Sequence, residues 1–181
     1  MKICPTNIPE VLVIEPSVFS DDRGYIYESY HQSKFTDVTG LTPVFVQDNH
    51  SGSFKGVLRG LHYQIHQPQG KLVRVASGEV FDVVVDLRRS SSTFGNWVGV
   101  YLSSENNRQI WVPEGFAHGF LVISDFAELL YKTTDFYAPE HERCISWDDP
   151  DLDIKWPLSE SPMLSGKDKL GLSLAQSEVF A

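Results

Sequence analysis

Residues 56–64, GVLRGLHYQ, carry an arginine and a histidine inside a run that otherwise has the composition of a β-strand. Strict alternation along a strand places Arg59 and His62 on opposite faces. A bulge at Gly60, which tolerates backbone conformations that other residues avoid, would turn both side chains toward one pocket. There His62 could transfer a proton and Arg59 could bind an anion. The same pair also fits a hydrogen-bonded core histidine and a solvated surface arginine.

A second motif supports the pocket. The segment WVPEGFAHGF (111–120) contains Pro113, Gly115 and His118 as PxGxxH, which resembles the second motif of the cupin superfamily of jelly-roll barrels. Where cupins supply two histidines and a glutamate to a metal, this chain has Gln64, His66 and Lys71. A lysine repels a divalent cation, and too few ligands remain for an open catalytic metal site. We therefore expect a cupin barrel that works without a metal.

The elements that must position these residues are mainly strands. Short runs rich in Val, Ile, Tyr, Phe and Thr predict β-strands at 10–16, 25–31, 44–49, 56–64, 71–76, 79–88, 97–103, 109–113, 118–124 and 127–137. The turn signals SGE (77–79) and ENN (105–107) indicate hairpins. We expect a short helix near 31–37, an irregular segment at 146–162 that packs its two tryptophans, and some helix after Pro162. The predicted fold is all-β: an antiparallel jelly-roll barrel with an N-terminal β extension and a short, partly helical C-terminal tail.

Composition limits the classes of protein. The 181 residues, 41% hydrophobic and 22% charged, suit one globular domain spanning 1–181. No apolar run approaches the ~20 residues that cross a bilayer, and MKICPTNIPE lacks a secretory apolar segment. Two cysteines, Cys4 and Cys144, predict unpaired thiols in a reducing cytoplasm. The net charge, 15 − 24 = −9, argues against nucleic acid or an anionic membrane as partner.

Several longer segments resemble the dTDP-4-dehydrorhamnose 3,5-epimerase family, in order and over nearly the whole chain. They are FSDDRGYIYESY (19–30), VQDNHSGSFKGVLRGLHYQ (46–64), QGKLVRVASGEVFDVVVDLR (69–88), VPEGFAHGF (112–120), LLYKTTDFYAPEHE (129–142) and SGKD (165–168). Departures are local, at Tyr25, Ile26, His141, Cys144 and Gly166. None removes an ionisable group that the family's mechanism needs.

This resemblance implies an isomerase of dTDP-linked 4-keto-6-deoxy sugars in dTDP-L-rhamnose or related deoxysugar synthesis. The ketone at C4 acidifies the hydrogens on C3 and C5. A base removes each proton from one face, and an acid returns a proton to the other. The product is dTDP-4-dehydro-L-rhamnose, and no cofactor is needed because the substrate carbonyl is the electron sink.

The resemblance also implies catalytic roles. His62 is the base, Asp168 is its carboxylate partner, Tyr131 is the acid, and Lys71 lies near the developing enolate oxygen. Asp82, within FDVVV, is a second candidate for orienting His62, and it also fits a paired polar group in the core. For Tyr131 taken alone, ordinary core packing is the commoner explanation of a tyrosine in a strand.

The remaining family positions concern substrate binding. Arg59 and His118 match residues that contact the sugar or its phosphates, and Phe19 suits stacking on thymine. Residues expected at the nucleotide end are Arg23, Glu28, Gln47, Asp48, Asn49, Glu142 and Lys167. Arg23, Arg59, Lys71 and Lys167 would converge on the diphosphate, or else are separate surface charges. The family is homodimeric, so Phe19, Arg23 and Glu28 are expected to act in the partner's pocket.

Three rival functions remain open from the sequence. A relative that inverts only C3 or only C5 would keep the same motifs. A metal-dependent cupin oxygenase or isomerase would need a bound metal, against which Lys71 and Gln64 argue. A noncatalytic sugar-nucleotide binding module would keep the cations and aromatic residues but would not need His62, Asp168 and Tyr131 together.

Overall fold

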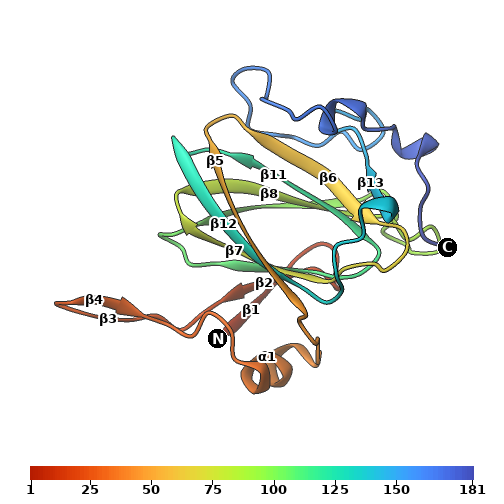
Figure 1. Ribbon diagram of the computed structural model, residues 1–181. Helices are drawn as coiled ribbons and strands as arrows, with labels where there is room; N and C mark the ends of the chain where they lie inside the picture. Colours follow the sequence, from red (N-terminus) through yellow and green to blue (C-terminus); the bar gives the residue numbers. More distant parts are fainter.

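The computed structural model describes all 181 residues. Its main feature is a pair of antiparallel sheets that face each other (Figure 1). One has the order β1-β2-β10-β7-β12-β5, the other β13-β6-β11-β8-β9, and β3-β4 forms a separate hairpin. The strands are β1 (Lys2–Pro5), β2 (Leu12–Glu15), β3 (Phe19–Asp21), β4 (Gly24–Ile26), β5 (Gln47–Phe54), β6 (Leu58–Gln64), β7 (Lys71–Ser77), β8 (Glu79–Asp86), β9 (Trp97–Ser103), β10 (Gln109–Val112), β11 (Phe116–Val122), β12 (Phe126–Thr133) and β13 (Glu142–Cys144). One α-helix, α1 (Gln32–Thr39), and 3-10 turns at Pro139–His141, Asp168–Leu170 and Leu174–Gln176 complete the chain. The predicted jelly-roll fold is confirmed.

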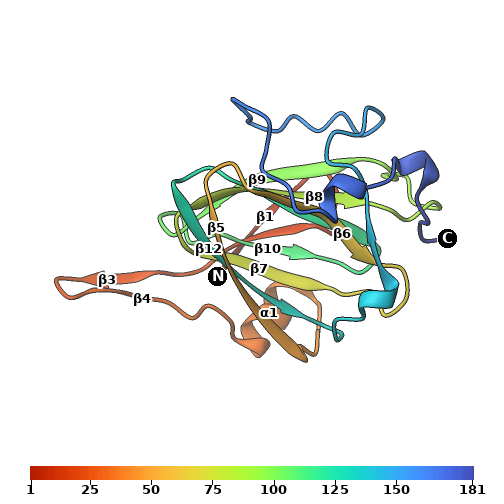
Figure 2. The ribbon, with the colours of Figure 1, turned by 45° about the horizontal axis from the view of Figure 1, so that its top comes forward.

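Two layers of buried apolar side chains pack against the sheets. The first lies between them and joins Val73 and Leu129 of one sheet to Val84 and Phe120 of the other. The second lies outside the five-stranded sheet, which the C-terminal segment covers (Figure 2). Strand β8 is therefore apolar on both faces, and this explains why EVFDVVVD does not alternate. Of the two tryptophans expected to pack from the irregular segment, Trp156 lies in the outer layer, edge-on to Phe81, and Trp147 is half-buried.

Two turn predictions are wrong in kind. SGE at 77–79 connects β7 to β8, and ENN at 105–107 connects β9 to β10. In each case the two strands belong to opposite sheets, so the turns are arches across the barrel and not hairpins. Gly78 has φ +76°, which suits the sharp change of direction.

The N-terminal extension is also present, with one correction. The predicted strand at 25–31 ends at Ile26, and the chain then enters α1, which Gly40 terminates with φ 73°. Hairpin β3–β4 projects from the barrel in both views (Figures 1 and 2). Its side chains have no sheet to pack against within the chain: Phe19 is 68% exposed and Ile26 is 73% exposed.

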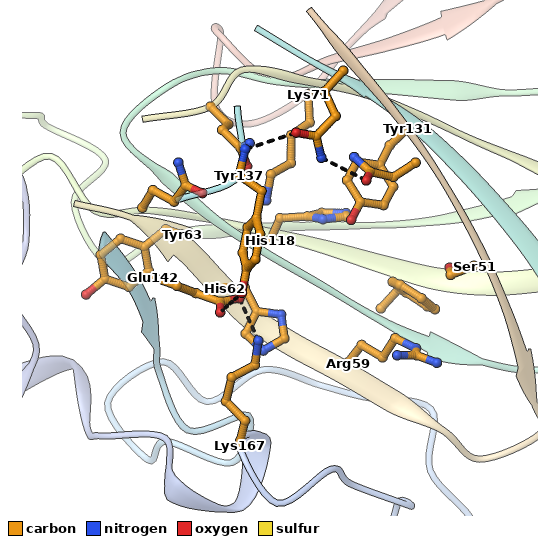
Figure 3. A pocket seen from close by; sticks show the side chains of 15 residues that line it. Ser51, Arg59, His62, Tyr63, Lys71, His118, Tyr131, Tyr137, Glu142 and Lys167 are labelled. Carbon is orange, nitrogen blue, oxygen red and sulfur yellow. Dashed lines mark hydrogen bonds and ion pairs between the residues drawn. The ribbon is translucent and has the colours of Figure 1, made fainter. Parts of the chain in front are cut away.

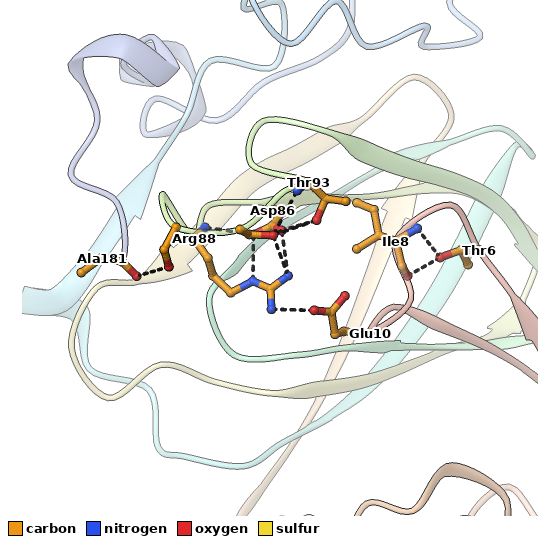
Figure 4. A network of polar contacts seen from close by, with 9 residues as sticks. Thr6, Ile8, Glu10, Asp86, Arg88, Thr93 and Ala181 are labelled. Carbon is orange, nitrogen blue, oxygen red and sulfur yellow. Dashed lines mark hydrogen bonds and ion pairs between the residues drawn. The ribbon is translucent and has the colours of Figure 1, made fainter.

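A network of hydrogen bonds and ion pairs lies at the end of β8 (Figure 4). Asp86 is fully buried and accepts hydrogen bonds from Arg88, Ser91 and Thr93, while Arg88 also pairs with Glu10 at 2.9 Å. This network ties the N-terminal segment to the barrel. Both cysteines are unpaired, as predicted. No helix has the length and apolar character needed to span a membrane.

Candidate active site

A cavity of about 350 Å³ opens between the two sheets, and chemically reactive side chains converge on it (Figure 3). Strands β5, β7 and β12 contribute from the six-stranded sheet, and β6, β11 and β13 contribute from the other. The lining residues are Gln47, Asn49, Ser51, Arg59, His62, Tyr63, Gln64, Gln69, Lys71, His118, Phe120, Tyr131, Tyr137, Glu142 and Lys167.

The alternation of β6 breaks where the sequence predicts. Opposite β11, His62 pairs with His118 and Arg59 pairs with Phe120, so three steps along β6 match two along β11. Gly60 lies within this bulge with φ +128°. A Cβ there would lie 2.5 Å from Gly119 Cα. The bulge allows both Arg59 and His62 to line the cavity.

Asp168 holds the imidazole of His62. His62 Nε2 donates to Asp168 Oδ1 at 2.6 Å, and the carboxylate is only 3% exposed. Burial opposes ionisation of Asp168, but hydrogen bonds from His62, Ser165 and the Gly60 N–H outweigh it and lower its pKa to about 2. With Nε2 facing a permanent carboxylate, Nδ1 is the nitrogen left to accept a proton.

Asp82 has a different partner. Its two carboxylate oxygens accept from His118 Nε2 at 3.0 and 2.9 Å, and both side chains are buried. The alternative that Asp82 orients His62 is therefore wrong, because its carboxylate is already engaged by the histidine of the neighbouring strand.

Lys71 and Tyr131 reach the cavity with unpartnered polar ends. Neither the Lys71 ammonium nor the Tyr131 hydroxyl forms a hydrogen bond or ion pair within the chain, and Lys71 is 9% exposed. Burial lowers the pKa of Lys71 to about 8, against the opposing charges of Asp82 and Glu142. Burial raises the pKa of Tyr131 more than nearby Arg59 lowers it, so the phenol keeps its proton at neutral pH.

The cavity is positively charged although the protein is acidic. Arg59, Lys71 and Lys167 face it with one carboxylate, Glu142. Glu142 accepts from Lys167 at 2.6 Å and from the Tyr137 hydroxyl at 2.8 Å. Three of the four cations expected to converge do so within the chain, and the cavity is suited to an anionic ligand.

Four predicted binding residues lie elsewhere in this chain. Phe19 and Arg23 belong to the projecting hairpin, where Arg23 pairs with Asp21 at 2.6 Å, and Glu28 pairs with Lys34. Asp48 is a correction: alternation along β5 turns it away from the cavity, and it pairs with Lys132 at 2.7 Å.

Some lining residues were not predicted. Ser51 continues the i, i+2 pattern of Gln47 and Asn49, so alternation along β5 could have identified it. Tyr137 follows the end of β12 and is brought in by the chain that leads to β13. The predicted strand at 127–137 included Tyr137, but β12 ends at Thr133, so strand alternation does not account for its position.

The cupin metal ligands are not assembled. The Gln64 amide donates to the carbonyls of Gln67 and Phe136 and accepts from the Ala138 N–H, so it braces two loops. His66 is exposed and stacks edge-on with His141, outside the cavity. Of that set Gln64, Lys71 and His118 line the cavity, and an amide, an ammonium and one histidine do not fit the superfamily's metal.

Fold and cavity together are those of a jelly-roll protein whose cavity groups are suited to proton transfer on an anionic ligand. The sequence model of the dTDP-4-dehydrorhamnose 3,5-epimerase family matches residues 5–176. The chain belongs to this family of isomerases, and the resemblance seen in its motifs is confirmed.

Individual relatives agree over the full length. A dTDP-4-dehydrorhamnose 3,5-epimerase of Pseudomonas aeruginosa is 62% identical over 99% of both chains. The structure of a dTDP-6-deoxy-D-glucose-3,5-epimerase from Legionella pneumophila, in complex with dTDP-4-keto-L-rhamnose, has a TM-score of 0.96 and 54% identity, covering 98% of this chain and 94% of that one. A 3'-monoepimerase from Streptomyces bikiniensis, in complex with dTDP-quinovose, has a TM-score of 0.89 and 36% identity, covering 97% of this chain and 88% of that one.

Proposed function

We propose that the protein inverts C3 and C5 of dTDP-4-dehydro-6-deoxy-D-glucose and so forms dTDP-4-dehydro-L-rhamnose. The observation that carries this proposal is the His62–Asp168 pair, which opens on the same cavity as Lys71 and Tyr131. A neutral imidazole, a protonated phenol and an ammonium are the base, acid and electrophile that an enolate mechanism needs.

Each inversion then has two proton transfers. His62 Nδ1 takes the proton from the carbon next to the ketone, and the C–H electron pair becomes the enolate while Asp168 stabilises the imidazolium. The ammonium of Lys71 stabilises the enolate oxygen. Tyr131 donates its proton to the opposite face of the carbon, and solvent exchange resets both side chains.

Binding follows from the local cations. Arg59 and Lys167 would bind the diphosphate, which is supported by their position in the cavity lining together with Gln47 and Asn49 of β5. His118, fixed by Asp82, would contact the sugar, and its position in the cavity lining supports this role.

We further propose a homodimer in which hairpin β3–β4 of one subunit completes the nucleotide end of the other. Support comes from the exposed apolar side chains of the hairpin and from its projection away from its own barrel. Phe19 would then stack on thymine, and Arg23 and Glu28 would act in the partner's cavity. Sedimentation velocity should give a dimer that Ile26→Asp weakens, and a wild-type monomer at micromolar concentration would contradict the proposal.

Two broader expectations complete the proposal. Residues 1–181 act as one domain, which the two apolar layers shared by both sheets and the C-terminal segment support. The unpaired Cys4 and Cys144 support action in a reducing cytoplasm.

The deciding experiment is incubation with dTDP-4-keto-6-deoxyglucose in deuterium oxide, followed by proton NMR at C3 and C5. We expect label and inversion at both carbons with wild-type protein, and neither with His62→Asn. Label at one carbon would instead support a single-centre epimerase, which the similarity to the 3'-monoepimerase makes the second candidate. Exchange at wild-type rates in His62→Asn would refute the assignment of the base.

A further inference from the structure

Three side chains of metal-ligating type lie close together, and one of them is the proposed base, His62. A ring nitrogen of His62, Cys144 Sγ and a carboxylate oxygen of Asp168 all lie within 4.8 Å of one another, and Nε2 is the nitrogen that faces Asp168, at 2.6 Å. The register of β13 on β6 pairs Cys144 directly with His62, and Asp168 enters from the 3-10 turn at Asp168–Leu170. The cluster therefore rests on the barrel's own strand pairing and on the docked tail.

The chemistry of this set suits a thiophilic divalent cation. Imidazole, thiolate and carboxylate are the three ligand types that zinc prefers, and three protein ligands leave a fourth position open. Metal–ligand bonds of about 2.0 to 2.3 Å would require Cys144 Sγ and the other two ligand atoms to move closer together. They would also require His62 Nε2 and the Asp168 oxygen to move apart. The carboxylate and the thiolate together balance the charge of the cation. Lys167, the residue before Asp168, is offset by its ion pair with Glu142 at 2.6 Å.

This set is separate from the cupin ligands. It contains neither Gln64 nor Lys71, so the argument against a cupin metal does not apply to it. Cys144 is one of the positions where the sequence departs from the family pattern.

We propose that His62, Cys144 and Asp168 form an inhibitory site for a soft divalent cation such as Zn²⁺. On binding, the thiol releases its proton to solvent and the imidazole proton shifts from Nε2 to Nδ1, because the metal takes the Nε2 lone pair. Nδ1 then has no lone pair for the substrate proton. Loss of activity by this route rests on the proposed role of His62, whereas metal binding itself does not.

Cobalt is the probe for binding, because thiolate coordination to Co²⁺ gives a sulfur-to-metal charge-transfer absorption in the near ultraviolet. The chain offers a matched control: Cys4 lies in β1, outside the cavity, and is also unpaired. After chelator treatment and dialysis, wild type and Cys4→Ser should each show the absorption and bind one Co²⁺. Cys144→Ser should lack the absorption. Its absence in wild type, or its persistence in Cys144→Ser, would overturn the proposal.

Inhibition is measured on the same variants. We expect the Zn²⁺ concentration for half-inhibition to rise more than about tenfold in Cys144→Ser relative to Cys4→Ser, since one of three ligands is lost. Equal inhibition of the two variants would refute the site. If Cys144→Ser does not fold by circular dichroism, cadmium-113 NMR of wild type replaces it: a resonance typical of one sulfur ligand supports the site, and one typical of oxygen and nitrogen alone refutes it. The cobalt absorption does not depend on turnover, so failure of this site and failure of the epimerase proposal are separable.

Discussion

The buried ammonium of Lys71 predicts an alkaline limit to catalysis. Burial lowers its pKa to about 8, and Asp82 and Glu142 limit the shift. A lysine with a lowered pKa is charged below that value and neutral above it, so stabilisation of the enolate oxygen should be lost as the pH rises through 8. With this pKa, about nine-tenths of the molecules carry the ammonium at pH 7 and about one-tenth at pH 9. We therefore expect kcat/KM to fall about tenfold between these values.

Other cavity groups with shifted pKa values move away from this range. Those of Tyr131, Tyr137 and Lys167 are raised, and that of Asp168 is about 2. Lys71 is therefore the group to which an alkaline limb near pH 8 is assigned.

The assay is the initial rate of inversion, followed by proton NMR from pH 6 to pH 10, for wild type and Lys71→Met. At pH 7 the variant should lose about 100- to 1,000-fold in kcat, the usual effect of removing one oxyanion donor. Its residual rate should not decline near pH 8. Lys132→Met, which removes a lysine that pairs with Asp48 instead, is the control and should keep the wild-type profile. An unchanged alkaline limb in Lys71→Met would refute the assignment.

Three further outcomes are expected. Tyr131→Phe should slow product formation more than exchange of the substrate hydrogens with deuterium, and normal rates of both would exclude Tyr131 as the acid. Gly60→Ala should destabilise the protein by more than about 2 kcal/mol in urea unfolding, since the new Cβ would lie 2.5 Å from Gly119 Cα. Gly24→Ala is the control, because Gly24 has a similar φ of +124° but has open space around it. Equal losses of stability in the two variants would contradict the steric argument. Asp86→Asn should lower the free energy of unfolding by about 2 kcal/mol at pH 7, because the folded structure lowers the pKa of Asp86 from 3.8 to about 2 and the variant loses that stabilisation. Because the folded pKa is depressed, this difference should shrink as the pH falls from 4 to 2, and a constant difference would count against the linkage.

The strands and much of the cavity could be predicted because they depend on local pattern. Alternation and β-branched residues identify β7, β9 and β10 almost to their ends. The conflict between alternation and chemistry in β6 also locates the bulge at Gly60. Strand β13 could not be found this way, because three residues, Glu142–Cys144, show no periodicity and pair with β6 far away in the chain.

Features that depend on the tertiary arrangement cannot be predicted from local sequence pattern either. A tight turn has similar chemistry in a hairpin and in an arch, so SGE and ENN do not reveal that they cross between sheets. Asp168 was reached only through family resemblance. Its contact with His62 depends on how the tail packs over the outer face of β6, β8 and β11, and no local pattern encodes that packing.

The two histidine–carboxylate pairs have distinct consequences although their histidines face each other across β6 and β11. His62 is 24% exposed at its side chain and bonded to one oxygen of Asp168, whereas His118 is 8% exposed and bonded to both oxygens of Asp82. Asp82 also raises the pKa of Lys71 against burial. A neutral residue in its place would leave His118 unfixed and would bring Lys71 closer to losing its charge at neutral pH. In the proposed mechanism Asp82 therefore supports the electrophile Lys71, because a buried carboxylate nearby helps to keep that lysine charged, while Asp168 supports the proposed base His62.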